Sequence, residues 1–145
     1  MFITTKKVNG IIDEATATAS TTAPIWQALT LGEAYTYHTS GGLRPPTQYT
    51  SVEYGSVKLV MLRGILKIAD GSRFSTSGNI QIATLPEGYR PSYLHTFVCV
   101  GHQEKQICQV QVQSDGGVLL VSSGSQHDFQ ATWGISLDQI RFFTN

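Results

Sequence analysis

Charged side chains are scarce in this sequence. They make up 14% of its 145 residues, and ten basic residues balance ten acidic ones, so the formal net charge is zero. Soluble domains usually carry about 25% charged residues. A neutral surface offers no electrostatic attraction to nucleic acid or to an anionic membrane, so we expect neither as a partner. A chain with so few charged residues is more typical of a subunit in an assembly than of a free monomer at high concentration.

Long apolar runs and a set of cysteines are also absent. No run approaches the ~20 residues that a membrane span needs, so no membrane insertion is expected. Two cysteines, Cys99 and Cys108, are too few for a disulfide framework. They flank a predicted hairpin and could face each other there, although two small buried hydrophobic side chains are the commoner arrangement.

Short apolar or alternating stretches, separated by turn signals, fill the chain from residue 24 onward. Asp70-Gly71 is a hairpin-type dipeptide, and residues 101–106 separate two stretches that look like paired strands. Seven or eight strands at this spacing predict an all-β fold, either an antiparallel β-sandwich or a jelly-roll or barrel head. No long helix and no fixed repeat are predicted. The main predicted strands cover 56–64, 65–68, 79–83, 95–100, 107–112, 118–121 and 140–143.

Residues 84–91, with the sequence TLPEGYRP, predict a stiff corner between two β blocks. Each proline interrupts regular structure, and Gly88 between them accepts a positive φ without steric cost. Tyr89 supplies a large side chain that can plug the corner. We therefore expect these residues to serve the fold and not a ligand.

The first 23 residues differ in composition from the rest. A short strand could form before the turn signal Asn9-Gly10, and residues 15–22 contain only Ala, Thr and Ser. We interpret 1–23 as a neck or linker, with a short helix over 11–15 as a minor alternative, and 24–145 as a β head. Residues 59–62 are apolar on both faces, which requires a second sheet or a neighbouring subunit against the outer face.

The acidic residues and histidines do not form an enzyme-like constellation. Asp70 and Asp115 precede glycine in turns, where aspartate bonds to its own backbone, and Asp138 suits a turn brace. Residues 124–126 (GSQ) lack the strand and helix that flank an esterase nucleophile. The adjacent His127-Asp128 could touch a ligand or calcium, but such a pair in a polar loop is usually only solvated. We therefore expect no enzyme, no metal and no cofactor.

Three polar loops have the composition that saccharide binding requires. An aromatic face stacks on the apolar side of a sugar or glycerol unit, while polar side chains bind its hydroxyl groups. Tyr35, Tyr37 and Trp133 could instead be buried plugs. The candidate residues are Tyr35, Tyr37, His38 and Arg44 in the first loop, His102, Gln103 and Glu104 in the second, and His127, Asp128 and Trp133 in the third.

An ordered set of segments across roughly residues 24–143 resembles the C-terminal head of phage tail fibres and receptor-binding proteins, including those on baseplates of phages that infect Gram-positive hosts. The segments are WQALTL (26–31), PPTQY (45–49), residues 57–64, TLPEGYRP (84–91), VQSDGGV (112–118) and WGISLDQIRF (133–142).

The resemblance implies a homotrimer of β heads that binds host-surface polysaccharide without catalysis. The N-terminal segment would contact other tail or baseplate proteins, and the protein, made in the host cytoplasm, would sit at the tail tip of the virion. Relatives on lactococcal phages hold a sugar with a His-x-Asp pair, where this chain has Gln109-Val110-Gln111, so that site does not carry over. The alternatives are a purely structural virion component with the same fold and the fibre tip of a phage-derived bacteriocin.

Overall fold

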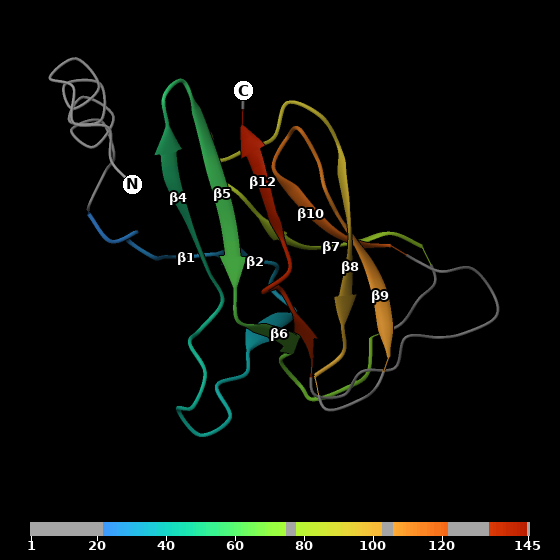
Figure 1. The fold of residues 1–145 in the computed structure, drawn as a ribbon. Helices are drawn as coiled ribbons and strands as arrows, with labels where there is room; N and C mark the ends of the chain where they lie inside the picture. The colour runs from blue at the N-terminus through green and yellow to red at the C-terminus, as the bar shows by residue number, and fades with distance from the viewer. Residues whose placement is uncertain (1–21, 75–77, 103–105, 122–133, 145) are drawn as a thin grey trace, which may run out of the picture.

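The computed structural model describes residues 22–74, 78–102, 106–121 and 134–144, and these residues form twelve strands and no helix (Figure 1). No helix long and apolar enough to cross a membrane therefore occurs in this part of the chain. The predicted all-β class is confirmed. The expected strand and Ala/Thr-rich stretch of the neck fall within residues 1–21, which lie outside the described residues.

All strand pairings are antiparallel, and the strands form three sheets (Figure 1). The four-stranded sheet runs in the order β1 (Gln27–Ala28), β4 (Gln48–Tyr54), β5 (Val57–Arg63), β12 (Arg141–Thr144). The five-stranded sheet runs β2 (Thr30–Leu31), β7 (Ile80–Thr84), β10 (Gly117–Val121), β9 (Ile107–Val112), β8 (His95–Val100). The three-stranded sheet runs β11 (Ile135–Ser136), β6 (Ile65–Ile68), β3 (Tyr35–Tyr37).

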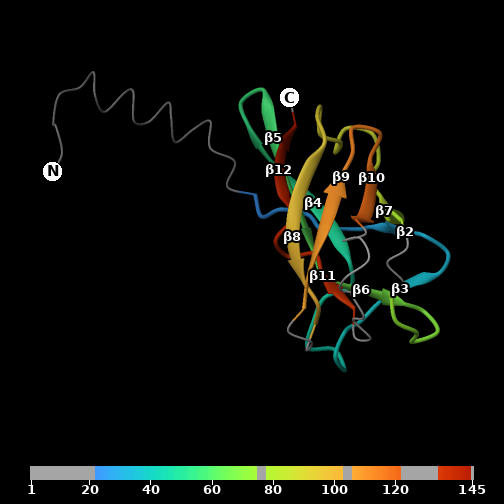
Figure 2. The same ribbon diagram turned by 90° about the vertical axis from the view of Figure 1, so that its right-hand side faces the viewer.

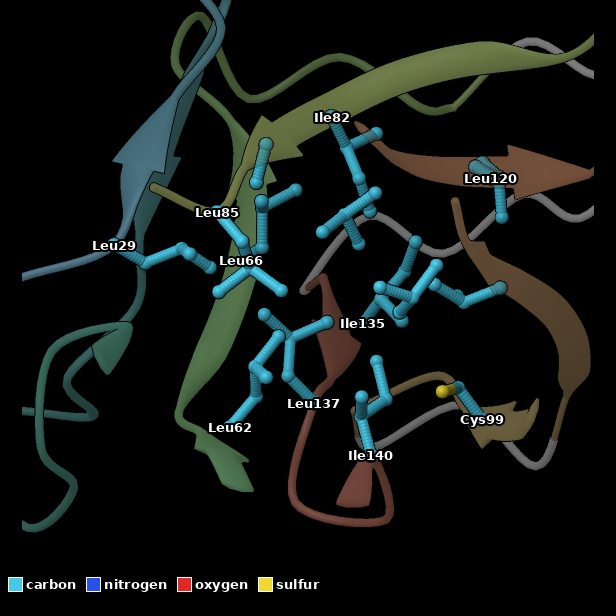
Figure 3. Packing of buried hydrophobic residues seen from close by; sticks show 14 of the residues in the cluster. Leu29, Leu62, Leu66, Ile82, Leu85, Cys99, Leu120, Ile135, Leu137 and Ile140 are labelled. Carbon is cyan, nitrogen blue, oxygen red and sulfur yellow. The ribbon is translucent and has the colours of Figure 1, made fainter. Parts of the chain in front are cut away.

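The two larger sheets pack face to face as a sandwich, with the core between them (Figures 1 and 2). Strand alternation supplies this core: Cys108, Val110 and Val112 on β9 are buried, while Ile107 and Gln109, which alternate with them, are exposed. Figure 3 shows side chains from β5, β6, β7, β10 and β11 converging on one interior. No sheet of the described strands closes on itself, so the sandwich, and not the barrel, is the correct alternative.

The strand predictions are confirmed for the hairpin of β8 and β9, whose bounds match 95–100 and 107–112. The prediction of a hairpin at Asp70-Gly71 is wrong. A turn does form there, with the Gly71 N–H donating to the Ile68 carbonyl at 3.1 Å, but it connects β6 and β7, which belong to different sheets. The very short strands β1, β2 and β11 were not predicted, because two residues show no periodicity.

Strand β5 has the double-sided burial that its sequence predicts. Val60 and Leu62 are in the core, and Leu59 and Met61 are half-buried on the opposite face. The chain enters this sheet through Trp26, whose ring lies 3.9 Å from the guanidinium carbon of Arg63. Residues 24–28 are thereby anchored to the sandwich by a cation–π contact.

Residues 84–91 form the predicted corner. Leu85 is fully buried, and its N–H donates to the Gly116 carbonyl at 2.8 Å. Arg90 Nε donates to the Leu85 carbonyl at 3.1 Å, and the Tyr89 ring packs edge-on against Tyr49 at 4.7 Å. These contacts tie the corner to both larger sheets.

Cys99 and Cys108 lie directly opposite each other on β8 and β9. Both thiols are free and buried, which matches the commoner of the two arrangements weighed from the sequence. The pKa of each thiol is raised to about 12, mainly by burial and to a smaller extent by Asp138 beside Cys99 and by Cys99 beside Cys108.

Candidate functional site

The first predicted loop follows β3 and folds back on itself. His38 donates its N–H to the Ile65 carbonyl at 2.9 Å, which fixes the start of the loop beside β6. The amides of Gly42 and Arg44 both donate to the Thr39 carbonyl, at 3.0 and 2.9 Å. Arg44 is exposed to solvent in this tight turn, and the segment between β3 and β4 to which it belongs runs to the lower end of the molecule in Figure 1.

The second predicted loop meets the first through a pair of imidazole rings. The ring centroids of His38 and His102 lie 5.4 Å apart, with a tilt of 46°. His102 follows β8, and its N–H donates to the Gly134 carbonyl at 2.8 Å. Gly134 is the first described residue after the third predicted loop. Three segments far apart in the sequence therefore meet at one end of the sandwich, which we call the loop end.

The loop end lowers the pKa of His102. Burial is the main cause, and the positive charge of Arg44 and the proximity of His38 act in the same direction. The imidazole is therefore neutral at pH 7. Its Nε2 atom is buried and has no hydrogen-bond partner among the described residues. A buried ring nitrogen without a partner costs free energy, so this atom would gain from a hydrogen bond to any polar group that reaches it.

The two tyrosines of the first loop have different surroundings. Tyr35 stacks on Phe74 with ring centroids 6.0 Å apart, packs against the core, and has its pKa raised by burial. Tyr37 is 48% exposed and lies on β3, the outer strand of its sheet. Tyr35 therefore packs as a plug, and Tyr37 is the aromatic side chain that is open to solvent.

The structure thus brings His38, Arg44 and His102 together and leaves Tyr37 accessible near them. The remaining candidates lie outside the described residues: Gln103, Glu104, His127, Asp128 and Trp133.

Comparison with known proteins shows similarity in structure only. No protein-family model matches the sequence, and no curated protein is significantly similar to it. The receptor binding protein gp15 of Listeria phage PSA gives a TM-score of 0.62 at 17% identity, and the alignment covers 96% of this chain and 76% of that one. The head domain from lactococcal phage bIL170 gives a TM-score of 0.50 at 9% identity, covering 84% of this chain and 97% of that one.

This chain has the fold of a phage receptor-binding head. At such low identity the similarity extends to the fold and not to individual side chains, so the chemistry of this head must be argued from its own residues.

The carboxylates predicted to hold turns in the head do so. Asp70 Oδ1 accepts the Ser72 N–H at 2.8 Å, and Asp115 Oδ1 accepts the Gly117 N–H at 2.8 Å. The bonds from Ser72 lower the pKa of Asp70. Asp138 accepts the Gly64 N–H at 2.9 Å and lies 3.2 Å from the Ser136 hydroxyl. Within the described ranges, no three His, Cys, Asp or Glu side chains are grouped as metal ligands.

One cavity on the head was not predicted from the sequence. A cavity of ≈ 420 Å³ lies between the start of β8 and strand β12. These segments are almost fifty positions apart in the sequence, and only the fold brings them together. The structure shows two exposed aromatic side chains there, Tyr93 before β8 and Phe143 on β12, which no sequence pattern had singled out. The cavity is lined by Ser92, Tyr93, His95, Arg141, Phe142 and Phe143.

Proposed function

We propose that this chain is the non-catalytic head of a phage receptor-binding protein, located at the tail tip or baseplate, and that its loop end attaches the virion to a saccharide on the host cell surface. The observation that carries this proposal is that His38, His102 and Gly134, from three segments far apart in the sequence, are in contact at one end of a fold shared with phage receptor-binding proteins. Loops on a rigid scaffold are where binding residues concentrate.

The chemistry of the loop end suits a polyhydroxylated ligand. Tyr37 offers an exposed ring for stacking on a sugar, and Arg44 offers a fork of hydrogen-bond donors. The Nε2 atom of His102, which has no hydrogen-bond partner among the described residues, adds a buried polar atom at this end. In this proposal, Gln103, Glu104, His127, Asp128 and Trp133 complete the site from the other two loops.

Self-association into a homotrimer is part of the proposal. The outer face of β8 and β9 carries Val98, Val100 and Ile107, which are 59%, 41% and 71% exposed. The other outward side chains of these two strands, Thr96, Gln109 and Gln111, are uncharged. An uncharged apolar face beside the open edge of β8 would promote aggregation of a free monomer. Burial against another copy of the chain would prevent this. Several heads on one tail tip would then turn weak single-site binding into firm attachment.

Binding of labelled protein to host cells, with competition by purified wall polysaccharide, tests this function. The double variant Tyr37→Ala/Arg44→Gln should weaken attachment by roughly tenfold or more, which corresponds to about 1.4 kcal/mol per factor of ten. Leu43→Ala is the matched control, because Leu43 is 88% exposed on the same loop but lacks a polar group or a ring. Light scattering on each variant shows whether the oligomeric state is unchanged.

A purely structural tail component is the second candidate, and the uncharged face of β8 and β9 favours it equally. The same experiment separates the two. Unchanged attachment of the double variant, or a failure of polysaccharide to compete, would remove the loop end from consideration and leave the structural role.

A further inference from the structure

We propose that the cavity between β8 and β12 is a second binding site, which takes an anionic saccharide unit, a sugar or polyol that carries a phosphate or carboxylate group. This inference depends on the proposed saccharide-binding function in one respect, the choice of a saccharide as the class of ligand. Its residues and its position are separate from the loop end.

The position of this cavity follows from the open edges of the sandwich. β8 is the last strand of the five-stranded sheet and β12 is the last strand of the four-stranded sheet, and the two do not pair with each other in the described structure. Figures 1 and 2 show these strands as neighbours where the two sheets meet without closing. We call this place the seam. His95 starts β8 and His102 follows its end, so the seam and the loop end are separated by roughly 20 Å.

The floor of the seam is rigid and aromatic. The His95 ring stacks on Phe142 with centroids 5.6 Å apart and an interplanar angle of 19°. The Phe97 ring lies 6.2 Å from His95 and 6.4 Å from Phe142, so the three rings form one cluster. Phe142 itself is only 4% exposed, so His95 is held by the hydrophobic core. A polar ring fixed in this way can present a hydrogen-bonding nitrogen to a ligand without losing conformational entropy.

The walls of the seam expose aromatic rings to solvent. Tyr93 is 74% exposed and Phe143 is 53% exposed, and both line the cavity. The Phe143 ring also rests edge-on against Tyr54 at 6.3 Å, which limits its motion. Exposed rings around a cavity of ≈ 420 Å³ provide a surface for the C–H face of a pyranose, in a space that holds one or two sugar units.

The charge of the lining selects among saccharides. Arg141 lines the cavity and is exposed, and none of the described residues that line it is acidic. A guanidinium binds phosphate and carboxylate groups through two parallel hydrogen bonds, which neutral sugars cannot accept in the same way. Ser92 and the His95 ring add hydrogen-bonding groups for hydroxyls. The combination of rings, one cation and no anion therefore favours an anionic sugar or polyol over a neutral one.

Amide chemical-shift titrations of the full chain with three probes test this assignment. Glucuronic acid and glycerol 1-phosphate should shift the amides of Tyr93, His95 and Phe143, and methyl β-glucoside should do so much more weakly. The two anionic probes distinguish a carboxylate from a phosphate ligand. Arg141→Gln should weaken binding at least tenfold, and Arg141→Lys should restore part of it. Added salt should weaken the interaction of the anionic probes.

Tyr93→Ala should also weaken binding, and Leu94→Ala is its matched control, since Leu94 is 51% exposed next to Tyr93 but does not line the cavity. The proposal is overturned if the seam amides do not respond to either anionic probe, or if the neutral glucoside binds equally well. It is also overturned if Tyr93→Ala changes the oligomeric state, because the rings would then belong to a subunit interface. Loss of cell attachment on changing Tyr37 and Arg44 reports on the loop end alone, so the two sites can fail independently.

Discussion

The loop end and the seam are candidate binding regions built in opposite ways. The loop end joins segments that leave the sandwich, and its chemistry comes from polar side chains such as Arg44 and the half-buried imidazole of His102. The seam is formed by the strands themselves, and its chemistry comes from side chains that alternate out of β12, namely Arg141 and Phe143. One region depends on loop conformation, and the other on the packing of two sheets.

This difference predicts which region tolerates change. A loop can be rebuilt without moving the sheets, since only its ends are bonded to them. The seam cannot, because its floor is Phe142, which is also part of the hydrophobic core. Variation of ligand specificity should therefore be easier at the loop end, and the seam should keep its shape as long as the sandwich folds.

The largest expected effect concerns the thiols that lie between the two regions. Burial raises the pKa of Cys99 and Cys108 from 9.0 to about 12, so the reactive thiolate is rare at pH 8. Reaction with a thiol reagent should be about 1,000-fold slower in the folded protein than in urea-unfolded protein. Stability should also fall as pH rises above 9, because the unfolded thiols lose their protons before the folded ones.

These thiols show whether a variant has disturbed the sheet or only a surface. Tyr37→Ala at the loop end and Tyr93→Ala at the seam should both leave the thiols as slow to react as in the unmodified chain. Fast labelling in either variant would mean that its loss of binding reflects an altered sandwich and not a lost ligand contact.

The second effect concerns the contact between Gly116, in the turn before β10, and the corner of residues 84–91 that leads the chain to the seam. Gly116 has a φ of +93°, and a Cβ atom there would overlap the Leu85 carbonyl oxygen and lie 2.7 Å from Arg90 Nε. Gly116→Ala should lower the free energy of unfolding by about 3–5 kcal/mol, from backbone strain plus steric overlap. Urea unfolding gives the value.

Gly88 in the same corner is the matched control. Its φ is +86°, but nothing lies within 4 Å of the position of an added Cβ. Gly88→Ala should therefore cost only about 1 kcal/mol, from the backbone conformation alone. If the two variants lost the same free energy of unfolding, the close approach of the corner to the turn before β10 would contribute nothing to stability.

The sequence was informative where a pattern is local. Alternation in 107–112 predicted β9, and the two prolines around Gly88 predicted the corner. It was uninformative where pairing is non-local. The turn at Asp70-Gly71 has hairpin chemistry, yet β6 finds its partners in β3 and β11 because burial of Ile65 and Leu66 outweighs the local turn preference.

The same distinction applies to the two candidate sites. The polar residues of the loops near His38 and His102 could be selected by composition, although not their contact. The seam could not be predicted, because Phe143 looked like an ordinary residue of a closing strand. Its exposure follows from the fact that β12 ends its sheet, a feature of topology that no short stretch of sequence encodes.

The smallest expected effect is a pH dependence of the free energy of unfolding that comes from His102 at the loop end and not from the seam. The pKa of His102 is lowered in the folded protein, so the unfolded chain takes up a proton at a higher pH than the folded chain does. The free energy of unfolding should be unaffected by this group above pH 6.5 and should fall as pH decreases from there toward the folded pKa. Urea midpoints measured between pH 5 and pH 8 would show this slope.

Two variants identify the origin of that slope. His102→Gln removes the titrating group and should flatten the dependence on pH below 6.5. Arg44→Gln removes one of the two neighbouring influences on His102 and should reduce the slope only in part, because burial is the larger cause. A slope that survives in His102→Gln would place the acid sensitivity elsewhere in the chain. In that case the His102 imidazole would not be a special feature of the loop end, and the proposed ligand contacts there would come from Tyr37 and Arg44 alone.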